Sequence, residues 1–210
     1  ASDGAGEIIA IGSAVTSWKI GDRVCASFFP QWQDGAIAPA KLASSLGGTV
    51  NGMLAEYVTL PQNAVVRIPS HLSYEEAATL PCAPLTAWNA LMESGPRMAP
   101  GQSLLIQGTG GVSIAAAQFA LAAGLRVIAL SSSEEKIKQL HKLQIHETIN
   151  YKQHPEWQQE VLRLTEGEGV DHIIEVGGAG TLPRSIEAVK LGGRISLIGV
   201  LTGISSQINP

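Results

Sequence analysis

The chain has 210 residues, of which 45% are hydrophobic and 15% are charged, enough to form one large globular domain or two smaller ones. Its formal net charge of -4 gives no basic surface of the kind that nucleic-acid binding requires. The apolar run at 114–123 is shorter than the roughly 20 residues of a membrane span and is interrupted by Gln118. With two cysteines and no secretion signal in residues 1–11, we expect a cytoplasmic protein without disulfides, nucleic acid or membrane as partners.

Residues 1–69 contain short β-like runs separated by Gly, Asp and Pro turns, which is typical of an antiparallel, barrel-like module. The expected strands are 7–12, 22–27, 54–60 and 64–68. Residues 30–50 are polar and rich in Gly and Ala, and they predict a long loop or lobe. The aromatic residues at its start either anchor this loop or line a pocket: Phe28, Phe29 and Trp32.

The pattern changes after Pro69. Ser73, followed by two glutamates and an Ala-rich run, predicts an N-capped helix, and residues 85–92 continue helically. Strands are then expected at 103–107, 126–130, 148–151, 172–176 and 194–200, and helices at 112–123, 134–143, 155–165 and 182–191. This alternation predicts an α/β fold, a Rossmann-type doubly wound parallel sheet covered by helices on both faces. We place the domain boundary between residues 85 and 86, giving domains 1–85 and 86–210.

A glycine-rich turn follows the strand at 103–107 and opens an Ala-rich helix. Dinucleotide binding requires this order: Gly108 makes the tight turn, and Gly110 lets the backbone approach a pyrophosphate at the positive end of the helix. Ser113 takes the third motif position, where a small residue allows close packing of helix on strand. The glycines alone also fit a simple chain reversal, but the repeated strand and helix units favour a cofactor. The expected phosphate contacts are Gly108, Thr109, Gly110, Gly111 and Val112.

The end of the next strand meets the adenosine ribose in sheets of this type, and an acid there excludes a 2′-phosphate. Here the strand ends in Ser131 and Ser132, with Lys136 one helical turn along, so NADP(H) is favoured over NAD(H). Two features oppose this interpretation: the serines also fit a helix cap, and Glu134 would repel a phosphate if it turned inward. The missing acid also argues against a methyltransferase that uses S-adenosylmethionine.

A series of short sequence blocks extends along nearly the whole chain, at residues 2–7, 21–24, 55–58, 77–81, 85–88, 108–113, 149–151, 169–171 and 192–194. Together they resemble the medium-chain dehydrogenase/reductase family, above all its zinc-independent branch that includes quinone oxidoreductases. The resemblance implies a GroES-like catalytic domain without its first part and a Rossmann domain without its last strand and helix. The chain would then be an internal piece of a homodimeric protein that transfers hydride between a nicotinamide and a carbonyl, alcohol or activated alkene.

The resemblance also indicates whether the protein should bind zinc. Zinc-dependent relatives carry Gly-His-Glu before the block that begins at Gly4, whereas this chain carries Ala-Ser-Asp, with Ser2 in place of the histidine. A hydroxyl is a poor zinc ligand, and residues 31–50 lack the cysteines of a structural zinc lobe. Cys82 matches another ligand position, which leaves one alternative, a site completed by Asp3 and a cysteine from a preceding segment. We expect no zinc.

The family places Thr86 near the nicotinamide, and Thr86 and Cys82 are the candidate catalytic residues, although ordinary helix packing also explains Thr86. Further cofactor contacts are expected at strand ends: Tyr151, Gly177, Gly199 and Val200. A half-buried aromatic at a strand end equally explains Tyr151 without a ligand. The histidines share no metal-ligand spacing, and we expect all of them at the surface: His71, His141, His146, His154 and His172. The predicted function is an NADP-preferring, zinc-independent oxidoreductase acting on a small molecule. The alternative is a regulatory protein that binds a dinucleotide without turnover.

Overall fold

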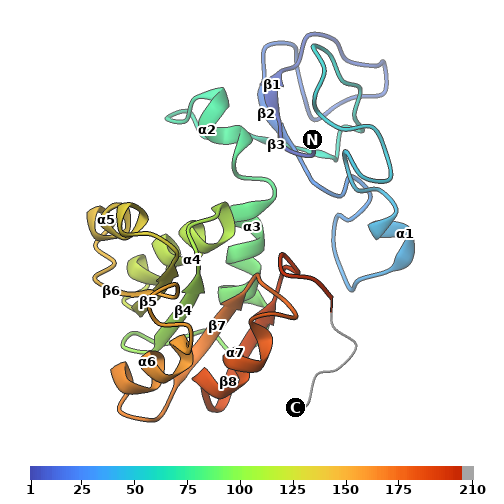
Figure 1. Ribbon diagram of the computed structural model, residues 1–210. Helices are drawn as coiled ribbons and strands as arrows, with labels where there is room; N and C mark the ends of the chain where they lie inside the picture. Colours follow the sequence, from blue (N-terminus) through green and yellow to red (C-terminus); the bar gives the residue numbers. More distant parts are fainter. Residues whose placement is uncertain (205–210) are drawn as a thin grey trace. The chain divides into compact units, whose positions relative to one another are not determined.

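The computed structural model describes residues 1–204 and divides the chain into two compact units, Ala1–Leu85 and Thr86–Pro210 (Figure 1). The first unit contains a three-stranded antiparallel sheet in the order β1 (Ala5–Glu7), β2 (Arg23–Ala26) and β3 (Val65–Arg67). Two short helices accompany it, α1 (Pro39–Leu42) and α2 (Tyr74–Ala78). The expected antiparallel arrangement is confirmed.

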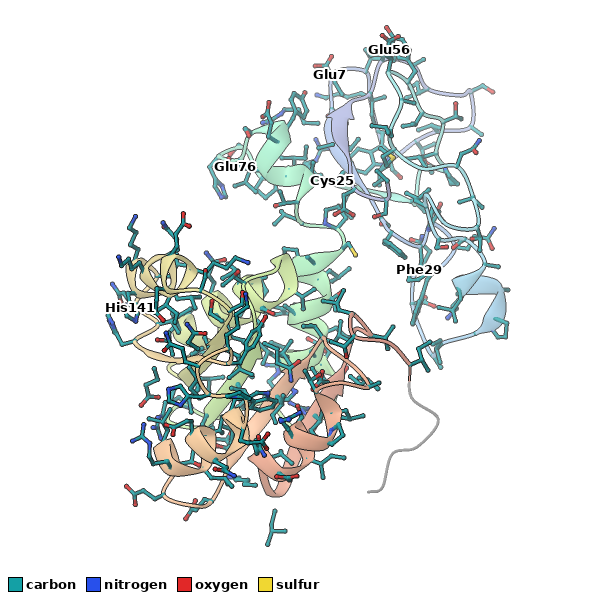
Figure 2. The ribbon with its side chains drawn as sticks, viewed as in Figure 1. Glu7, Cys25, Phe29, Glu56, Glu76 and His141 are labelled. Atoms are coloured by element: carbon teal, nitrogen blue, oxygen red, sulfur yellow. The ribbon has the colours of Figure 1, made fainter. Side chains whose placement is uncertain are left out.

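The small core of the first unit forms between its sheet and α2. Cys25 is 3% exposed, packs with Ile68 and Ala77, and donates its thiol to the Ala77 carbonyl at 3.3 Å (Figure 2). The helix begins with a capping box, because Ser73 Oγ accepts from the Glu76 amide at 3.1 Å and the Glu76 carboxylate accepts from the Ser73 amide at 2.8 Å. The predicted N-cap at Ser73 is therefore confirmed, as is the core position of Cys25.

Two strand predictions in this unit fail. The run at 7–12 is wrong beyond Glu7, where β1 ends, and the run at 54–60 forms no strand. A strand needs a partner for its backbone groups, and the described sheet ends at β1 and β3; Leu54 and Tyr57 are 89% and 73% exposed. The expected loop at 30–50 contains only α1 as a helix. At its start Phe29 packs against Phe28 and Trp32, with ring centroids 4.5 and 5.8 Å away, which supports the anchoring interpretation.

The second unit is built on a five-stranded parallel sheet in the order β6-β5-β4-β7-β8. Its strands are β4 (Ser103–Gln107), β5 (Arg126–Ser131), β6 (Glu147–Asn150), β7 (Val170–Glu175) and β8 (Val189–Leu197). Helix α3 (Ala83–Trp88) runs across the boundary after Leu85 and continues into the π-helix η1 (Asn89–Glu93). The other helices of this unit are α4 (Gly111–Ala122), α5 (Glu134–Lys142), α6 (Trp157–Leu164) and α7 (Leu182–Ala188). Helices lie on both faces of this sheet (Figure 1), as predicted.

The central strand shows why both faces are covered. Successive side chains of a strand point to opposite faces, and in β4 Leu104 and Ile106 join a core with α4, whereas Leu105 joins a second core with Trp157 and Val161 of α6. All three β4 residues have 0% exposed surface. The continuous apolar run of β4 is therefore that of a strand buried on both sides.

The helix expected at 182–191 is wrong beyond Ala188, where α7 ends and β8 follows directly. Val189 pairs with Val170, but the next pair joins Arg194 to His172, so the residues between form an irregular bulge. Gly192 lies in this bulge with a φ of +75°. The bulge explains why the regular strand pattern in the sequence starts only at Arg194.

The surface position expected for His172 is also wrong, since its exposed fraction is 1%. His172 lies on the buried strand β7, where Ser196 of the neighbouring strand β8 gives it a polar partner at 2.8 Å. The other four histidines are exposed as expected, including His141 on α5 (Figure 2). Among residues 1–204, no helix has both the length and the apolar character needed to cross a membrane.

Candidate cofactor-binding site

The glycine turn joins β4 to α4 and leaves the start of this helix uncapped. Gly108 has a φ of +75°, and its amide donates to the Leu130 carbonyl of β5 at 2.9 Å, which fixes the turn to the sheet. Gly110 is the N-cap residue of α4, and no side chain caps this end. Gly110 and Gly111 are both exposed. Because the first amides of a helix have no intrahelical acceptor, the start of α4 offers donors and positive potential to an anion.

The space above the turn is open. A Cβ atom built on Gly108 or on Gly110 would meet no heavy atom within 4 Å. Gly110 has φ -75° and ψ 169°, a conformation that any residue adopts, so neither its backbone nor its packing demands a glycine. A pyrophosphate that approaches this backbone closely does demand one. The turn thus fits the phosphates of a dinucleotide.

Ser113 completes the motif by packing the helix against the strand. Its side chain is 1% exposed, and its hydroxyl donates to the backbone carbonyl of Gln107 at 2.8 Å. A buried hydroxyl is costly unless it is hydrogen-bonded, and this bond satisfies it. Serine therefore serves at the third motif position, as expected from its size.

The sheet reverses its strand order next to this turn. From β4 the chain continues to β5 and β6 on one side, whereas β7 and β8 lie on the other side, so the carboxyl ends of β4 and β7 border a topological switch point. Gln107 and Glu175 end these two strands, and the Gln107 amide donates to the Glu175 carboxylate at 2.6 Å. This buried pair escaped the sequence prediction, because neither residue belongs to a recognisable motif.

Three of the predicted nicotinamide contacts meet at the same edge. The segment after β8 lies against the turn after β7: the Leu201 amide donates to the Val176 carbonyl at 3.2 Å, and the Thr202 amide to the Gly177 carbonyl at 2.7 Å. A Cβ atom on Gly199 would stand 2.6 Å from the Val176 carbonyl oxygen. Gly199 is thus needed for close backbone packing, whereas a Cβ atom on Gly177 would clash with the Thr181 hydroxyl. Val200 is 50% exposed.

The serines after β5 have different environments. Ser131 has 0% exposed surface, and its hydroxyl lies within 3.5 Å of the Ser133 backbone. Ser133 caps α5 by accepting from the Lys136 amide at 3.3 Å, which confirms the capping interpretation for this residue. Ser132 is half-buried, and Lys136 is exposed. Of Ser131, Ser132 and Lys136, only Ser132 and Lys136 therefore have side chains that solvent reaches.

Two further residues, Glu134 and Tyr151, lie near the carboxyl ends of β5 and β6. The Glu134 carboxylate accepts from the side-chain amides of Asn150 at 2.7 Å and Gln153 at 3.2 Å, which ties it to the end of β6. Tyr151 follows β6, is 40% exposed, and donates its backbone amide to the Ser131 carbonyl at 3.0 Å. The backbones of Tyr151 and Ser131 thus lie side by side, at the ends of the adjacent strands β6 and β5.

The two candidate catalytic residues lie at or before α3. Thr86 is half-buried on α3, and Trp88 fixes this helix by packing edge-to-face on Phe119 of α4, with ring centroids 5.4 Å apart. Cys82 belongs to the first unit. Burial raises the pKa of its thiol, and the negative charge of Asp3 raises it further. Cys82 is therefore a thiol at neutral pH, a weak nucleophile.

No group of three or more His, Cys, Asp or Glu side chains that could hold a metal ion occurs within residues 1–204. Ser2, at the position of the family's histidine ligand, donates its hydroxyl to the Asp3 carboxylate at 2.9 Å.

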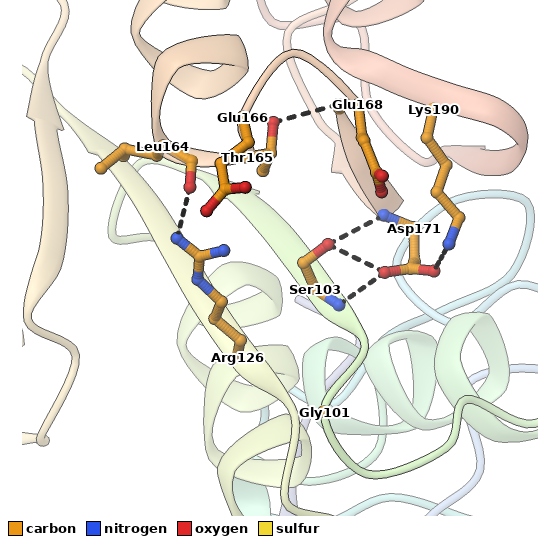
Figure 3. Close-up of a pocket in the computed structure, with 10 residues that line it drawn as sticks. Gly101, Ser103, Arg126, Leu164, Thr165, Glu166, Glu168, Asp171 and Lys190 are labelled. Atoms are coloured by element: carbon orange, nitrogen blue, oxygen red, sulfur yellow. Dashed lines mark hydrogen bonds and ion pairs between the residues drawn. The ribbon is translucent and has the colours of Figure 1, made fainter.

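A separate hollow of about 270 Å³ lies at the amino edge of the sheet, at the starts of β4, β5 and β7 (Figure 3). Asp171 accepts from the Ser103 amide at 2.8 Å and forms an ion pair with Lys190, and Arg126 donates to the Leu164 carbonyl at 2.7 Å. Two further carboxylates line the hollow, Glu166 and Glu168. Burial acts to raise the pKa of Asp171, but the bonds from Lys190 and Ser103 outweigh it, and the pKa is lowered. The bonds of Asp171 thus join the starts of β4 and β7 to Lys190 of β8.

Comparison with known proteins covers both units. Residues 1–70 match the family model of the alcohol dehydrogenase GroES-like domain, and residues 111–210 match that of zinc-binding dehydrogenases. The chain is 48% identical over 209 residues to a zinc-type alcohol dehydrogenase-like protein of Schizosaccharomyces pombe, covering 99% of this chain and 60% of that protein. It is 30% identical to human quinone oxidoreductase, covering 100% of this chain and 56% of that protein.

Among solved structures, a provisionally assigned alcohol dehydrogenase from Sinorhizobium meliloti 1021 superimposes with a TM-score of 0.90 at 42% identity. That match covers 99% of this chain and 61% of the other. The chain thus spans about three-fifths of the length of the proteins that it resembles.

Proposed function

Because the chain belongs to the medium-chain dehydrogenase/reductase family, we propose that its protein is an NADP-preferring oxidoreductase that works without catalytic zinc. Hydride would pass between the nicotinamide and a carbonyl, alcohol or activated alkene. The observation that carries this proposal is the glycine turn, where the uncapped start of α4 lies under open space beside the switch point of the sheet. The bound nicotinamide dinucleotide supplies the hydride donor or acceptor.

The residues of the turn bind the phosphates in this proposal. Thr109 and Gly111, together with Gly108, Gly110 and Val112, offer backbone amides near the start of α4. The turns that end at Gly177 and Val200, and the hydroxyl of Thr86, serve the nicotinamide half. Most of the rate acceleration then comes from holding hydride donor and acceptor together in the correct orientation.

The proposed preference for NADP(H) is supported by the side chains that follow the carboxyl end of β5. Ser132 offers a hydroxyl and Lys136 a positive charge, and no carboxylate ends the strand itself. The nearest acid is Glu134, whose carboxylate accepts from the side-chain amides of Asn150 and Gln153. These two bonds hold its negative charge away from a phosphate bound at Ser132 and Lys136. The hydroxyl of Ser131 supports the turn from inside, because it is fully buried. Tyr151 flanks the adenine side.

A mechanism without zinc is supported by the residues at the family's ligand positions. Ser2 replaces the histidine and is bonded to Asp3, so this position lacks the imidazole that zinc prefers, and Cys82 belongs to no group of three ligand side chains within residues 1–204. Catalysis in this proposal needs no metal-bound substrate oxygen. We further propose a small-molecule substrate, a cytoplasmic location, a homodimeric assembly, and neither nucleic acid nor membrane as partner.

The test is a titration of the full chain, stripped of metal by a chelator, with NADPH and with NADH. Nicotinamide fluorescence reports binding, and a panel of quinones, enones, aldehydes and ketones then reports turnover. We expect tighter binding of NADPH and turnover without added metal. Preference for NADH would overturn the cofactor assignment, and activity restored only by zinc would overturn the metal-free mechanism. Binding without turnover of any substrate would favour the regulatory alternative.

A further inference from the structure

Glu175 ends β7 with a carboxylate that has no access to solvent, since its exposed fraction is 0%. Burying a carboxylate is costly unless hydrogen bonds replace its water. Its Oε1 atom accepts from the backbone amides of Gly177 at 2.7 Å and Gly178 at 3.0 Å, and from the Thr181 hydroxyl at 2.5 Å. One oxygen thus organises the whole turn after β7.

The other oxygen, Oε2, reaches across the switch point to β4. It accepts from the side-chain amide of Gln107 at 2.6 Å, and Gln107 Oε1 in turn accepts from the amides of Val176 at 3.2 Å and Gly177 at 3.3 Å. These contacts fix the orientation of the Gln107 side-chain amide, with Nε2 toward Glu175 and Oε1 toward the backbone amides. The Gln107 backbone carbonyl also accepts from Ser113 in the glycine turn. One continuous network therefore joins the turn after β7 to the turn after β4.

The helix after the β7 turn is part of the same network. Ser185 of α7 donates to Glu175 Oε2 at 2.5 Å and accepts from the Gln107 amide at 2.9 Å. Ser185 and Gln107 are 0% and 7% exposed, so water does not compete for these bonds. The described hydrogen bonds of Glu175 include no residue of β5, α5 or β6, which form the adenosine side of the edge.

We propose that Glu175 is a positioning residue for the dinucleotide, which holds the backbone turn at 176–178 in register with the glycine turn at 108–113. This inference rests on the proposed function, because both turns border the proposed cofactor site. Glu175 is fully buried and acts through Gly177 and Gln107. Its removal therefore weakens the binding of the pyrophosphate and nicotinamide half, and leaves the adenosine half bound as before.

The test begins with Glu175→Gln in the full chain. The new amide group faces the amide group of Gln107, so two donors confront each other and the orientation of Gln107 is lost. We expect the Kd for NADPH to rise about tenfold or more, as for loss of a charged hydrogen bond. The Kd for 2′,5′-ADP, which lacks the nicotinamide half, should stay unchanged. Uniform weakening of both ligands would indicate general loosening of the fold and overturn the inference.

Exchanging the two residues in a double variant should restore NADPH binding. In the double variant Gln107→Glu with Glu175→Gln, the carboxylate at 107 accepts from the new amide at 175 and from the amides of Val176 and Gly177. The carbonyl oxygen at 175 still accepts from Gly178 and Thr181. Every buried donor keeps an acceptor, so the Kd for NADPH should return to within about threefold of the original. Failure of the swap to restore binding would contradict the network.

Two further variants separate the possible outcomes. Glu147→Gln makes the same chemical change at the amino end of β6, where Glu147 pairs with Arg126, and should leave the Kd for NADPH unchanged. If Glu175→Gln fails to fold, Thr181→Val removes a single donor, and NADPH binding should still weaken relative to 2′,5′-ADP. Unchanged NADPH binding in a folded Glu175 variant overturns this inference alone. No NADPH binding by the original chain overturns the proposed function instead.

Discussion

Arg194 on β8 donates from Nη2 to Nδ1 of His172 on β7 across 3.3 Å. An imidazole nitrogen that accepts from a guanidinium carries no proton, so the other nitrogen, Nε2, donates to the Ser196 hydroxyl at 2.8 Å. Burial, together with the positive charge of Arg194, lowers the pKa of His172 to about 4. His172 is therefore neutral in the folded protein over the physiological range.

This pair predicts acid sensitivity of the fold. Between pH 6.5 and about 4 the unfolded chain binds a proton at His172 and the folded chain does not, so the free energy of unfolding decreases as the pH falls through this window. The free energy of unfolding should fall by about 3 kcal/mol across this window, and His172 should cause no further fall at lower pH. Urea unfolding at a series of pH values measures it.

His172→Gln is the control, because the amide keeps a polar side chain on β7 but does not titrate. Its free energy of unfolding should depend less on pH between 4 and 6.5 than that of the original chain. Equal slopes for the two proteins in this range would refute the assignment of the low pKa to His172.

A second prediction separates binding from stability within the glycine turn. Gly110→Ala should leave the free energy of unfolding within about 1 kcal/mol, because φ is -75° and the added Cβ meets open space. The same Cβ takes the place of a phosphate oxygen, so the Kd for NADPH should rise about tenfold. Urea unfolding and fluorescence titration measure the two effects.

Gly108→Ala provides the matched comparison. Its φ of +75° is strained for alanine, so this variant should lose about 1 kcal/mol or more of stability. If Gly110→Ala binds NADPH as tightly as the original chain, the turn does not bind the pyrophosphate.

The third prediction concerns the choice of cofactor. Lys136→Ala keeps the cap of α5, because Ser133 accepts from the backbone amide of residue 136. Loss of the ammonium group should raise the Kd for NADPH about fivefold and leave the Kd for NADH unchanged, and added salt should reduce the difference. Lys138→Ala, an exposed lysine two residues along the same helix, points in another direction and serves as the control. Equal effects of Lys136→Ala on both cofactors would contradict a role at the 2′-phosphate.

The second unit could be predicted closely from the sequence because its signals are local. The strand expected at 103–107 coincides with β4, and the glycine turn follows from spacing alone. Parallel strands end at one edge, so Ser131 and Tyr151 could be placed together without a structure. The run at 54–60 could not be judged in this way, because a strand exists only where a partner strand pairs with it.

The buried polar groups could not be predicted for a related reason. Glu175 ends an apolar strand, and a single acid there has no local signature. Its partner Gln107 lies 68 residues away in the sequence, and the serine that bonds to Gln107, Ser185, lies 78 residues from it. His172 likewise depends on Arg194, which reaches it only through the pairing of β7 with β8. Such networks are long-range consequences of the sheet.

A fourth prediction comes from the ends of the helices. In α4 the residue after the C-cap is Gly124, with φ +76°; its amide donates to the Leu121 carbonyl, and that of Leu125 donates to the Ala120 carbonyl. These two bonds define a Schellman motif, which requires a left-handed residue and normally uses glycine.

In α5 the same motif is formed with Gln144, whose φ is +64°. Its amide donates to the His141 carbonyl, and that of Ile145 donates to the Leu140 carbonyl. Gln144 is exposed, so its side chain contributes little packing, and a left-handed backbone costs a residue with a Cβ about 1 kcal/mol. Gln144→Gly should therefore raise the free energy of unfolding by about 0.5–1 kcal/mol in urea titrations. Gln144→Ala keeps the strain and should give no gain; equal effects of the two substitutions would show that the backbone at 144 is not the cause.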